Sequence, residues 1–362
     1  MRALVVIAVA LVAACSPPSE LPPMSDSLAA ADLEADLASL VPLLLSDYNV
    51  PGASVAVLVD GEVVLARGYG QRQAGGGSMP VDENTVFQAA SLSKPVVAFG
   101  VHRLMAERPT ALSLDQPLMA HRPPPGPYDE DDPRFGEVTP RHVLSHSTGL
   151  PNWRPNDSGP NPEPLKFRRD PGTDFGYSGE GYLYLQRVVE RITGETLDRY
   201  LRRTVLDPVG MADSSFLWEA SFDDRYASPH DKKGRPREKY RPRQASAAGT
   251  LHTTAVDYAR FLQAVLGDGP DGTGAWLAKE STIDSSLGWA LGVGYEAKAQ
   301  GDVFWQWGDD GGFKALMAGS RERGVAVVVL TNSDRGLNVA RPVVERVLGS
   351  ELQFLDYRML NY

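Results

Sequence analysis

The chain has 362 residues, 42% of them hydrophobic and 23% charged, a balance typical of a folded globular protein and not of a disordered one. Its formal net charge of −10 argues against nucleic acid as the main partner, because a phosphate backbone requires a basic surface. Basic residues gather only at residues 232–243, where interleaved prolines predict a solvated loop. A rim that attracts anionic substrates or surfaces is the alternative.

The N-terminus indicates export and a lipid anchor. Arg2 precedes an apolar run, residues 4–14, which is long enough for a signal-peptide core and too short to cross a bilayer. Small residues then lead directly to Cys15, an arrangement that resembles the lipobox of bacterial lipoproteins. We therefore expect a signal peptide over residues 1–15, a Pro/Ser-rich tether over residues 16–30, and a protein anchored to a bacterial membrane on the periplasmic side or in the cell envelope. A cleaved signal peptide with an incidental cysteine is the alternative.

Residues 31–362 are expected to form the folded domain, which begins with a helix and a hairpin. Apolar residues recur at three- and four-residue steps over residues 28–48, predicting an amphipathic helix that bends or ends near Pro42. Two β-rich runs, residues 53–59 and 62–69, flank an Asp-Gly pair typical of a two-residue turn.

The middle of the chain is predicted to be helical and its last third rich in strands. A short loop from residue 87 leads into the first of the predicted helices, which cover residues 96–106, 140–144, 181–194, 255–266 and 342–353. The predicted strands cover residues 300–307, 315–320 and 325–331. This order predicts an α/β (α+β) fold: an antiparallel sheet from about residues 50–70 and 300–335, flanked by terminal helices, with an all-helical subdomain at about residues 95–285.

Ser91 and Lys94 are the first candidate catalytic pair. Spaced three residues apart on a helix, their side chains would lie on one face, a turn apart. A serine needs a base to take its proton as it attacks, and a lysine can serve only if burial or positive neighbours lower its pKa. The free N–H groups at a helix start, including that of Ser91, could hold a developing oxyanion. Ser-x-x-Lys alone is a weak signal, since such a chain contains about one by chance.

Further motifs follow in an order typical of one superfamily. They are Val50-Pro51-Gly52 before the hairpin, Leu144 to Pro151, Pro171 to Ser178, Ala248 to Thr254 with Asp257 to Phe261, and Trp305-Gln306-Trp307-Gly308 with Gly311-Gly312-Phe313. With Ser91-x-x-Lys94, they resemble the serine β-lactamases, penicillin-binding proteins and related esterases, in the class C-like or peptidase-S12-like branch. The resemblance covers roughly residues 50–335 and implies a β-lactamase/transpeptidase-like fold.

The resemblance implies a role for each matching residue. Ser91 would be acylated and Lys94 would relay its proton. Tyr177 would be the general base or the partner of the lysine, and as a base it would need the charge of Lys94 to lower its pKa. Backbone N–H groups of Ser91 and Asp309 would form the oxyanion hole. The residues expected to contact the substrate are Gln306, Trp307, Gly308 and Gly179.

Two positions depart from the family pattern. The family's asparagine after Tyr-Ser is Gly179 here, and its lysine or histidine on the recognition strand is Gln306. A neutral hydrogen bond contributes about 0.5–1.5 kcal/mol and a charged one about 1.5–3 kcal/mol, so the second change weakens recognition of a substrate carboxylate by roughly tenfold. This favours an esterase-like or peptidase-like hydrolase over an efficient β-lactamase.

The sequence thus predicts a serine hydrolase that acts through an acyl-enzyme on ester or amide substrates, including D-amino-acid peptides and β-lactam-like compounds. A non-catalytic periplasmic binding or sensing module and a true class C-like β-lactamase are the alternatives. Partners are expected to be a small acyl or peptide substrate and the membrane; no cofactor or metal site is indicated. His146 is interpreted as a buried, hydrogen-bonded histidine. The tryptophans at 153, 289, 305 and 307 are predicted to pack in the core, with a cleft lining as the alternative.

Overall fold

The structure is a computed structural model that describes residues 30–357, except residues 76, 78, 157, 158, 160 and 271, together with residue 360. The expected signal peptide, the lipidation site at Cys15 and the tether up to residue 29 lie outside the described residues. Within the described part of the chain, no helix combines the length and the apolar character needed to cross a membrane.

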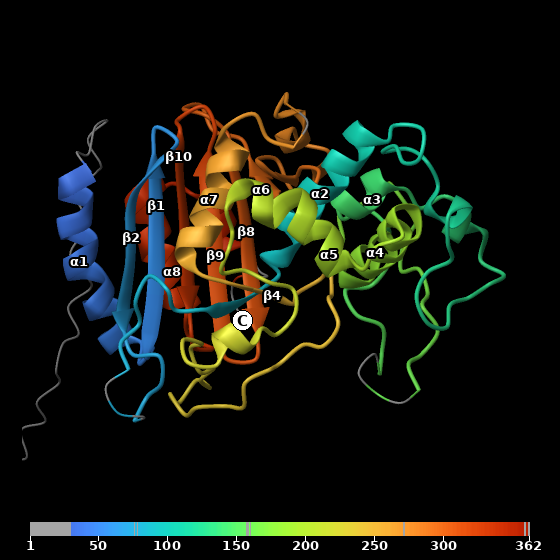
Figure 1. The fold of residues 1–362 in the computed structure, drawn as a ribbon. Helices are drawn as coiled ribbons and strands as arrows, with labels where there is room; N and C mark the ends of the chain where they lie inside the picture. The colour runs from blue at the N-terminus through green and yellow to red at the C-terminus, as the bar shows by residue number, and fades with distance from the viewer. Residues whose placement is uncertain are drawn as a thin grey trace, which may run out of the picture.

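An antiparallel sheet forms the centre of the molecule (Figure 1). Its strand order is β2-β1-β10-β9-β8-β7-β6-β5, so the N-terminal hairpin pairs with the last strand of the chain. The strands are β1 (Gly52–Val59), β2 (Glu62–Gly70), β5 (Ser281–Thr282), β6 (Leu287–Trp289), β7 (Gly294–Glu296), β8 (Val303–Asp310), β9 (Phe313–Ser320) and β10 (Val325–Thr331). A separate two-stranded sheet pairs β3 (Phe87–Ala90) with β4 (Leu251–Thr253).

The predicted hairpin forms because its turn residues tolerate the backbone conformation it needs. Asp60 and Gly61, between β1 and β2, have φ angles of 51° and 77°. Two-residue hairpins require such positive φ angles, which glycine and aspartate adopt at low cost. The strands before and after this pair are therefore in antiparallel register, as predicted.

The helices cover both faces of the sheet and build the region beside it (Figure 1). They are α1 (Ala30–Asp47), α2 (Ser93–Glu107), α3 (Pro140–Leu144), α4 (Gly179–Thr193), α5 (Leu197–Leu201), α6 (Asp207–Val209), α7 (Ala255–Leu266) and α8 (Leu337–Leu348). Of the two options predicted near Pro42, an end of the helix is excluded, because α1 continues through Pro42 to Asp47. Buried Val41 and Leu45 hold its last turns against the neighbouring elements. The last helix likewise begins at Leu337, five residues before its predicted start.

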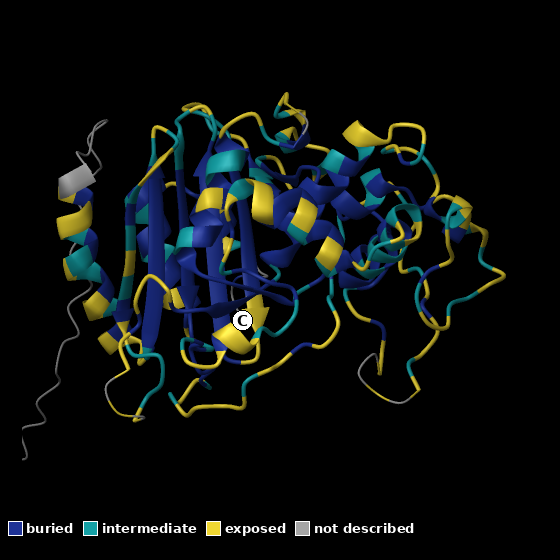
Figure 2. Ribbon diagram, in the orientation of Figure 1, coloured by how far each residue is buried: buried dark blue, intermediate teal, exposed yellow. Residues whose placement is uncertain are grey.

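Two apolar cores lie on opposite faces of the sheet, whose central strands β1, β10, β9 and β8 are mostly buried (Figure 2). Along β1, Val55 and Val57 face the core made with α1 and α8, whereas Ala56 and Leu58 face the core made with α2, α4 and α7. This alternation follows from the two-residue period of a strand. The predicted α/β fold, an antiparallel sheet flanked by terminal helices with a helical region beside it, is confirmed.

Two sets of short strands were not predicted from the sequence. Residues 87–90 form β3, so the prediction of a loop there is wrong, and residues 281–296 add β5, β6 and β7 to the sheet. All four residues of β3 are buried. Such a strand shows no alternation of polar and apolar residues, the signal that identifies longer strands.

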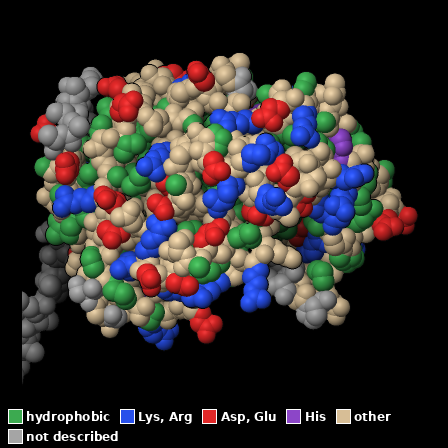
Figure 3. Space-filling model, in the orientation of Figure 1, with side chains coloured by type: hydrophobic (Ala, Val, Ile, Leu, Met, Phe, Trp, Pro, Cys, Tyr) green, Lys and Arg blue, Asp and Glu red, His purple; other side chains and the backbone are tan. Residues whose placement is uncertain are grey.

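The basic run at residues 232–243 is mostly exposed and contains no helix or strand. Three of its arginines form ion pairs, which are Arg235 with Asp231, Arg237 with Asp334, and Arg241 with Asp223, at 2.6–2.8 Å. On the face seen in Figure 3, acidic and basic side chains are interspersed and do not gather by sign. These observations fit the predicted solvated loop.

Candidate active site

Ser91 lies in a tight turn between β3 and α2. Ala90, the residue before it, has a φ angle of 48°, a left-handed conformation that is uncommon for a residue with a side chain. The Ser93 hydroxyl donates to the carbonyl of Ala90 at 2.6 Å and accepts from the N–H of Leu251 in β4 at 2.9 Å. These bonds hold the strained turn in place, and the Ser91 side chain remains partly exposed.

Lys94 lies one helical turn after Ser91 and is buried beside it. Its Nζ is 3.0 Å from the Ser91 Oγ and donates to the carbonyl of Ala248 at 2.6 Å. The side chain is 1% exposed, and burial lowers the pKa of Lys94 from 10.5 to about 7. A large fraction of this amine is therefore neutral near pH 7. A neutral amine that donates to Ala248 keeps a lone pair that can accept the Ser91 proton.

Tyr177 reaches the same place from the segment that precedes α4. Its ring centroid is 5.0 Å from the Lys94 Nζ, and its hydroxyl accepts from the Gln306 Nε2 at 3.1 Å. Burial raises the pKa of Tyr177 above its usual value, and interactions with Ser91 and Gln306 offset this only in part. The phenol is therefore protonated at neutral pH. Of the two roles implied for it, proton relay with Lys94 agrees better with this shift than general base.

His146 fixes the segment that carries Tyr177. Its Nδ1 accepts the N–H of Ser178 at 3.0 Å, and its carbonyl accepts the N–H of Gly176 at 2.7 Å. The His146 ring lies 4.1 Å from the Tyr177 ring, and burial, followed by the charge of Lys94, lowers the pKa of His146 well below its usual value. A neutral, buried and hydrogen-bonded histidine agrees with the interpretation made from the sequence.

Strand β8 brings Gln306 behind Tyr177. The Gln306 side chain is fully buried, and its Nε2 donates both to the Tyr177 hydroxyl and to the carbonyl of Trp307 at 2.8 Å. Both amide hydrogens of Gln306 are thus engaged in hydrogen bonds within the protein. In this arrangement Gln306 holds the Tyr177 hydroxyl in position. The Trp307 ring is also buried, with its centroid 4.8 Å from that of Tyr177, so it supports the phenol from another side.

Gly308 allows β8 to approach the strand before Ser91. A Cβ at this position would lie 2.3 Å from the carbonyl oxygen of Ala89, closer than atoms can pack. Glycine is therefore required for this contact. Asp309 follows directly, so its backbone lies at the same end of the two strands as Ser91, where the expected oxyanion hole would form. The Asp309 carboxylate forms an ion pair with Lys314.

Gly179, at the start of α4, stands against a tryptophan. A Cβ here would lie 2.7 Å from the Trp153 Cη2 and 3.0 Å from the carbonyl oxygen of Asn152. The Gly179 N–H donates to the Asn152 Oδ1 at 2.9 Å. Any side chain at position 179 would therefore displace Trp153.

Sequence-predicted residues from distant parts of the chain thus meet at one place. Ser91, Lys94, Tyr177 and Gln306 form a connected group, with Gly308 beside the strand that leads to Ser91. Among the described residues, no cluster of three or more His, Cys, Asp or Glu side chains could hold a metal ion.

The sequence profile of the Beta-lactamase family matches residues 29–348. The chain belongs to this family. It is 32% identical over 259 residues to Penicillin-binding protein 4 of Amycolatopsis lactamdurans, covering 66% of each chain. It is 31% identical over 248 residues to Esterase EstB of Burkholderia gladioli, covering 60% of each chain. The chain therefore spans between 60% and 66% of the length of these two relatives.

The fold is also found in solved structures. That of D-alanine carboxypeptidase AmpC from Burkholderia cenocepacia is similar, with a TM-score of 0.74 and 19% sequence identity. The similarity covers 89% of this chain and 99% of that chain. At this identity the likeness concerns the fold alone.

Two features of this Beta-lactamase family site were not predicted from the sequence. They are the Ser93 hydroxyl that bridges β4 to the Ser91 turn and the Ala248 carbonyl that binds Lys94. Trp289, Trp305 and Trp307 are buried as predicted, but Trp153 is 44% exposed, so the prediction of core packing is wrong for this one residue. The signal available in the sequence was its position two residues after the Leu144–Pro151 motif.

Proposed function

We propose that this protein is a serine hydrolase that forms an acyl-enzyme on Ser91 and prefers uncharged carboxylic esters. The observation that carries the proposal is the buried Lys94 amine, 3.0 Å from a partly exposed Ser91 hydroxyl and with a pKa lowered to about 7. Burying an amine without a carboxylate partner costs stability, and such sites are where catalytic bases are found.

The reaction follows from these protonation states. The Ser91 Oγ attacks the acyl carbon while its proton passes to the Lys94 Nζ, and the N–H groups of Ser91 and Asp309 hold the oxyanion. The bond to the leaving alcohol then breaks. The alcohol oxygen takes a proton from the Tyr177 hydroxyl, which recovers one from Lys94. Water then attacks the acyl-enzyme and gives a proton to the same pair of residues. The bond between the acyl carbon and the Ser91 Oγ breaks, the pair returns that proton to the Ser91 oxygen, and the acid leaves.

The charges near β8 support esters over substrates that carry a carboxylate. Position 306 has no positive charge, and both hydrogens of its amide are engaged within the protein. Asp309 and Asp310 follow, the first paired with Lys314 and the second hydrogen-bonded by Gln88. Asp334 lies 3.7 Å from Lys314 and pairs with Arg237, so three acidic and two basic side chains gather at this strand end. This balance disfavours the carboxylate of a β-lactam or of a peptide C-terminus.

The proposal is tested by labelling and by a substrate panel. A fluorophosphonate probe should label the purified protein, and Ser91→Ala should abolish both labelling and hydrolysis of p-nitrophenyl acetate. Persistent labelling of the variant would remove Ser91 from its role, and absence of both activities in the parent would favour the non-catalytic binding module. Nitrocefin turnover as fast as ester hydrolysis would favour a β-lactamase.

The proposed setting is the cell envelope, with a lipid on Cys15 holding the enzyme to a bacterial membrane. The apolar run before Cys15 and the Pro/Ser-rich stretch after it support this proposal. Cys15→Ala should move the protein from the membrane fraction to the soluble one, and unchanged fractionation would refute lipidation.

A further inference from the structure

Trp153 exposes a large aromatic ring beside the candidate active site. It belongs to the few large apolar side chains that the described residues leave exposed, and its ring edge lies against Gly179. Gly179 stands between Tyr177 and Tyr182, whose ring centroids are 5.0 and 5.6 Å from the Lys94 Nζ. The exposed ring thus lies against the start of α4, two residues after Tyr177.

The backbone of Trp153 is fixed on both sides although its side chain is exposed. Before it, the Asn152 carbonyl accepts the N–H groups of Gly179 and Glu180, each at 3.1 Å. After it, the Arg154 guanidinium forms a buried double hydrogen bond with the Glu180 carboxylate at 2.8 and 2.7 Å. Arg154 also donates to the carbonyl of Pro127 at 2.8 Å.

These contacts have a consequence for binding. A buried, bidentate arginine–carboxylate pair is among the more rigid connections in proteins. An aromatic ring on an immobilised backbone loses little conformational entropy when a ligand covers it. Little of the free energy gained from the apolar contact is therefore spent on ordering the protein.

We propose that Trp153 is a specificity-determining residue, whose ring forms an apolar wall that binds an alkyl or aryl substituent of the acyl donor. The inference rests on the proposed hydrolase function and names the substrate class within it. Where the family pattern places the polar side chain of an asparagine, this chain has Gly179 and the edge of Trp153. The site therefore offers apolar surface where an amide group would otherwise hydrogen-bond the substrate.

The first test compares esters that differ only in apolar length. We measure kcat/KM for p-nitrophenyl acetate, butyrate and hexanoate, and for methyl, butyl and hexyl acetate, in the parent and in Trp153→Ala, Trp153→Phe and Tyr48→Ala. Tyr48, exposed at the end of α1, is the matched control. Trp153→Ala should lower the hexanoate-to-acetate ratio or the hexyl-to-methyl ratio of kcat/KM by about tenfold, with Trp153→Phe intermediate and Tyr48→Ala unchanged.

The second test uses the steric coupling and does not depend on activity. Gly179→Asn should lower the melting temperature in the parent, because its side chain would collide with Trp153, and should lower it much less in the Trp153→Ala background. Equal destabilisation in both backgrounds would contradict the contact from which the proposal starts.

The two proposals fail in different ways. Loss of all ester hydrolysis in the parent would refute the proposed function. If the parent is active, equal losses for short and long esters in Trp153→Ala, or no loss at all, would overturn the role of Trp153. A change in oligomeric state with unchanged ester ratios would make the ring an interface residue and would also overturn it.

Discussion

The chemistry of the site depends on how strongly one amine binds its proton. No carboxylate among the described residues forms an ion pair with Lys94, and burial is the cause that lowers its pKa to about 7. Tyr177, in the same surroundings, is shifted in the opposite direction, because burial disfavours the charged form of either group. One environment therefore yields a neutral base and a neutral acid side by side, the combination that proton transfer to and from Ser91 requires.

This protonation state predicts the pH dependence of activity. Lys94 accepts a proton only when neutral, so kcat/KM for p-nitrophenyl acetate should rise with pH through an apparent pKa of about 7 and level off above it. Rates measured from pH 5 to 9, after subtraction of spontaneous hydrolysis, check this. An inflection near the ordinary value of a lysine would show that the amine is not desolvated.

Two variants assign this inflection to its residue. Lys94→Arg places a group that stays charged beside Ser91, and kcat/KM should fall by about 10²–10⁴-fold with no inflection near 7. Tyr177→Phe should also reduce the rate but keep the inflection, because the titrating amine is still present. Loss of the inflection in Tyr177→Phe would assign it to the phenol.

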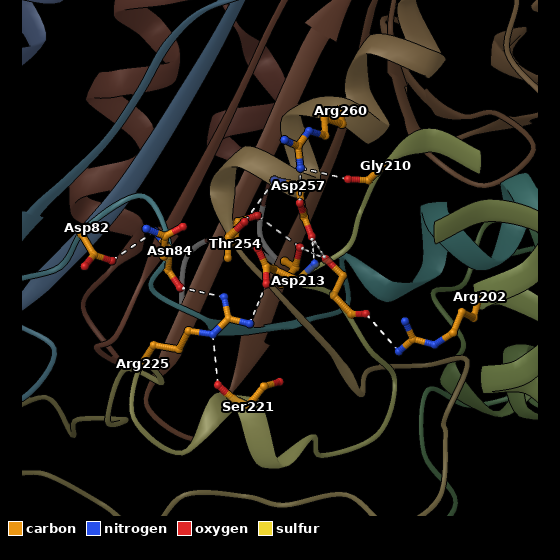
Figure 4. Close-up of polar contacts among 12 residues, drawn as sticks. Asp82, Asn84, Arg202, Gly210, Asp213, Ser221, Arg225, Thr254, Asp257 and Arg260 are labelled. Atoms are coloured by element: carbon orange, nitrogen blue, oxygen red, sulfur yellow. Dashed lines mark hydrogen bonds and ion pairs between the residues drawn. The ribbon is translucent and has the colours of Figure 1, made fainter. Parts of the chain in front are cut away.

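At the scale of elements, the Ser91 turn depends on the short sheet of β3 and β4, which a buried carboxylate supports (Figure 4). Asp257, at the start of α7, accepts the N–H of Asp213 at 2.7 Å and the hydroxyl of Ser214 at 2.8 Å. The Ser214 hydroxyl lies 2.7 Å from that of Thr253 in β4. The motif at residues 257–261 therefore has a structural explanation in this network.

Removing that carboxylate should destabilise the fold. Asp257→Ala removes the acceptor of two hydrogen bonds, from the Asp213 N–H and from the buried Ser214 hydroxyl, and the expected loss is about 2–5 kcal/mol of unfolding free energy in a urea titration. Arg260, which pairs with Asp257 but is 43% exposed, is the control, and Arg260→Ala should cost less than about 1 kcal/mol. Equal losses would assign the effect to the ion pair.

The sequence predicted the contacts that lie within one element better than those that join distant ones. Ser91 and Lys94 meet because a helix places positions three apart on one face, a local rule. Tyr177 was found through the order of motifs. By contrast, the pairing of β3 with β4, about 160 residues later, and the contact of Trp153 with Gly179 depend on tertiary packing, which no spacing along the chain encodes.

At the scale of the whole molecule, the site lies where the two cores meet. Tyr177 packs with the core of the terminal helices, whereas Leu92, next to Ser91, packs with the core of the helical region. Because the site is built from both cores, unfolding of the protein exposes the groups that the site buries. The protonation of these groups therefore contributes to the free energy of unfolding.

That connection predicts how stability varies with pH. In the unfolded chain Lys94 keeps a proton up to about pH 10, whereas in the folded protein burial lowers its pKa to about 7. Between these values the unfolded state binds more protons, so the contribution of Lys94 to stability is lowest below pH 7 and increases as the pH rises toward 10. From pH 7.5 to 9 the gain should be about 2 kcal/mol. Lys94→Met lacks this titration, so urea unfolding of both proteins should show their stability difference shifting toward the parent by this amount, with all other groups cancelling. A difference that stays constant over this range would mean that Lys94 remains charged in the folded protein, which would remove the neutral base on which the proposed acylation depends.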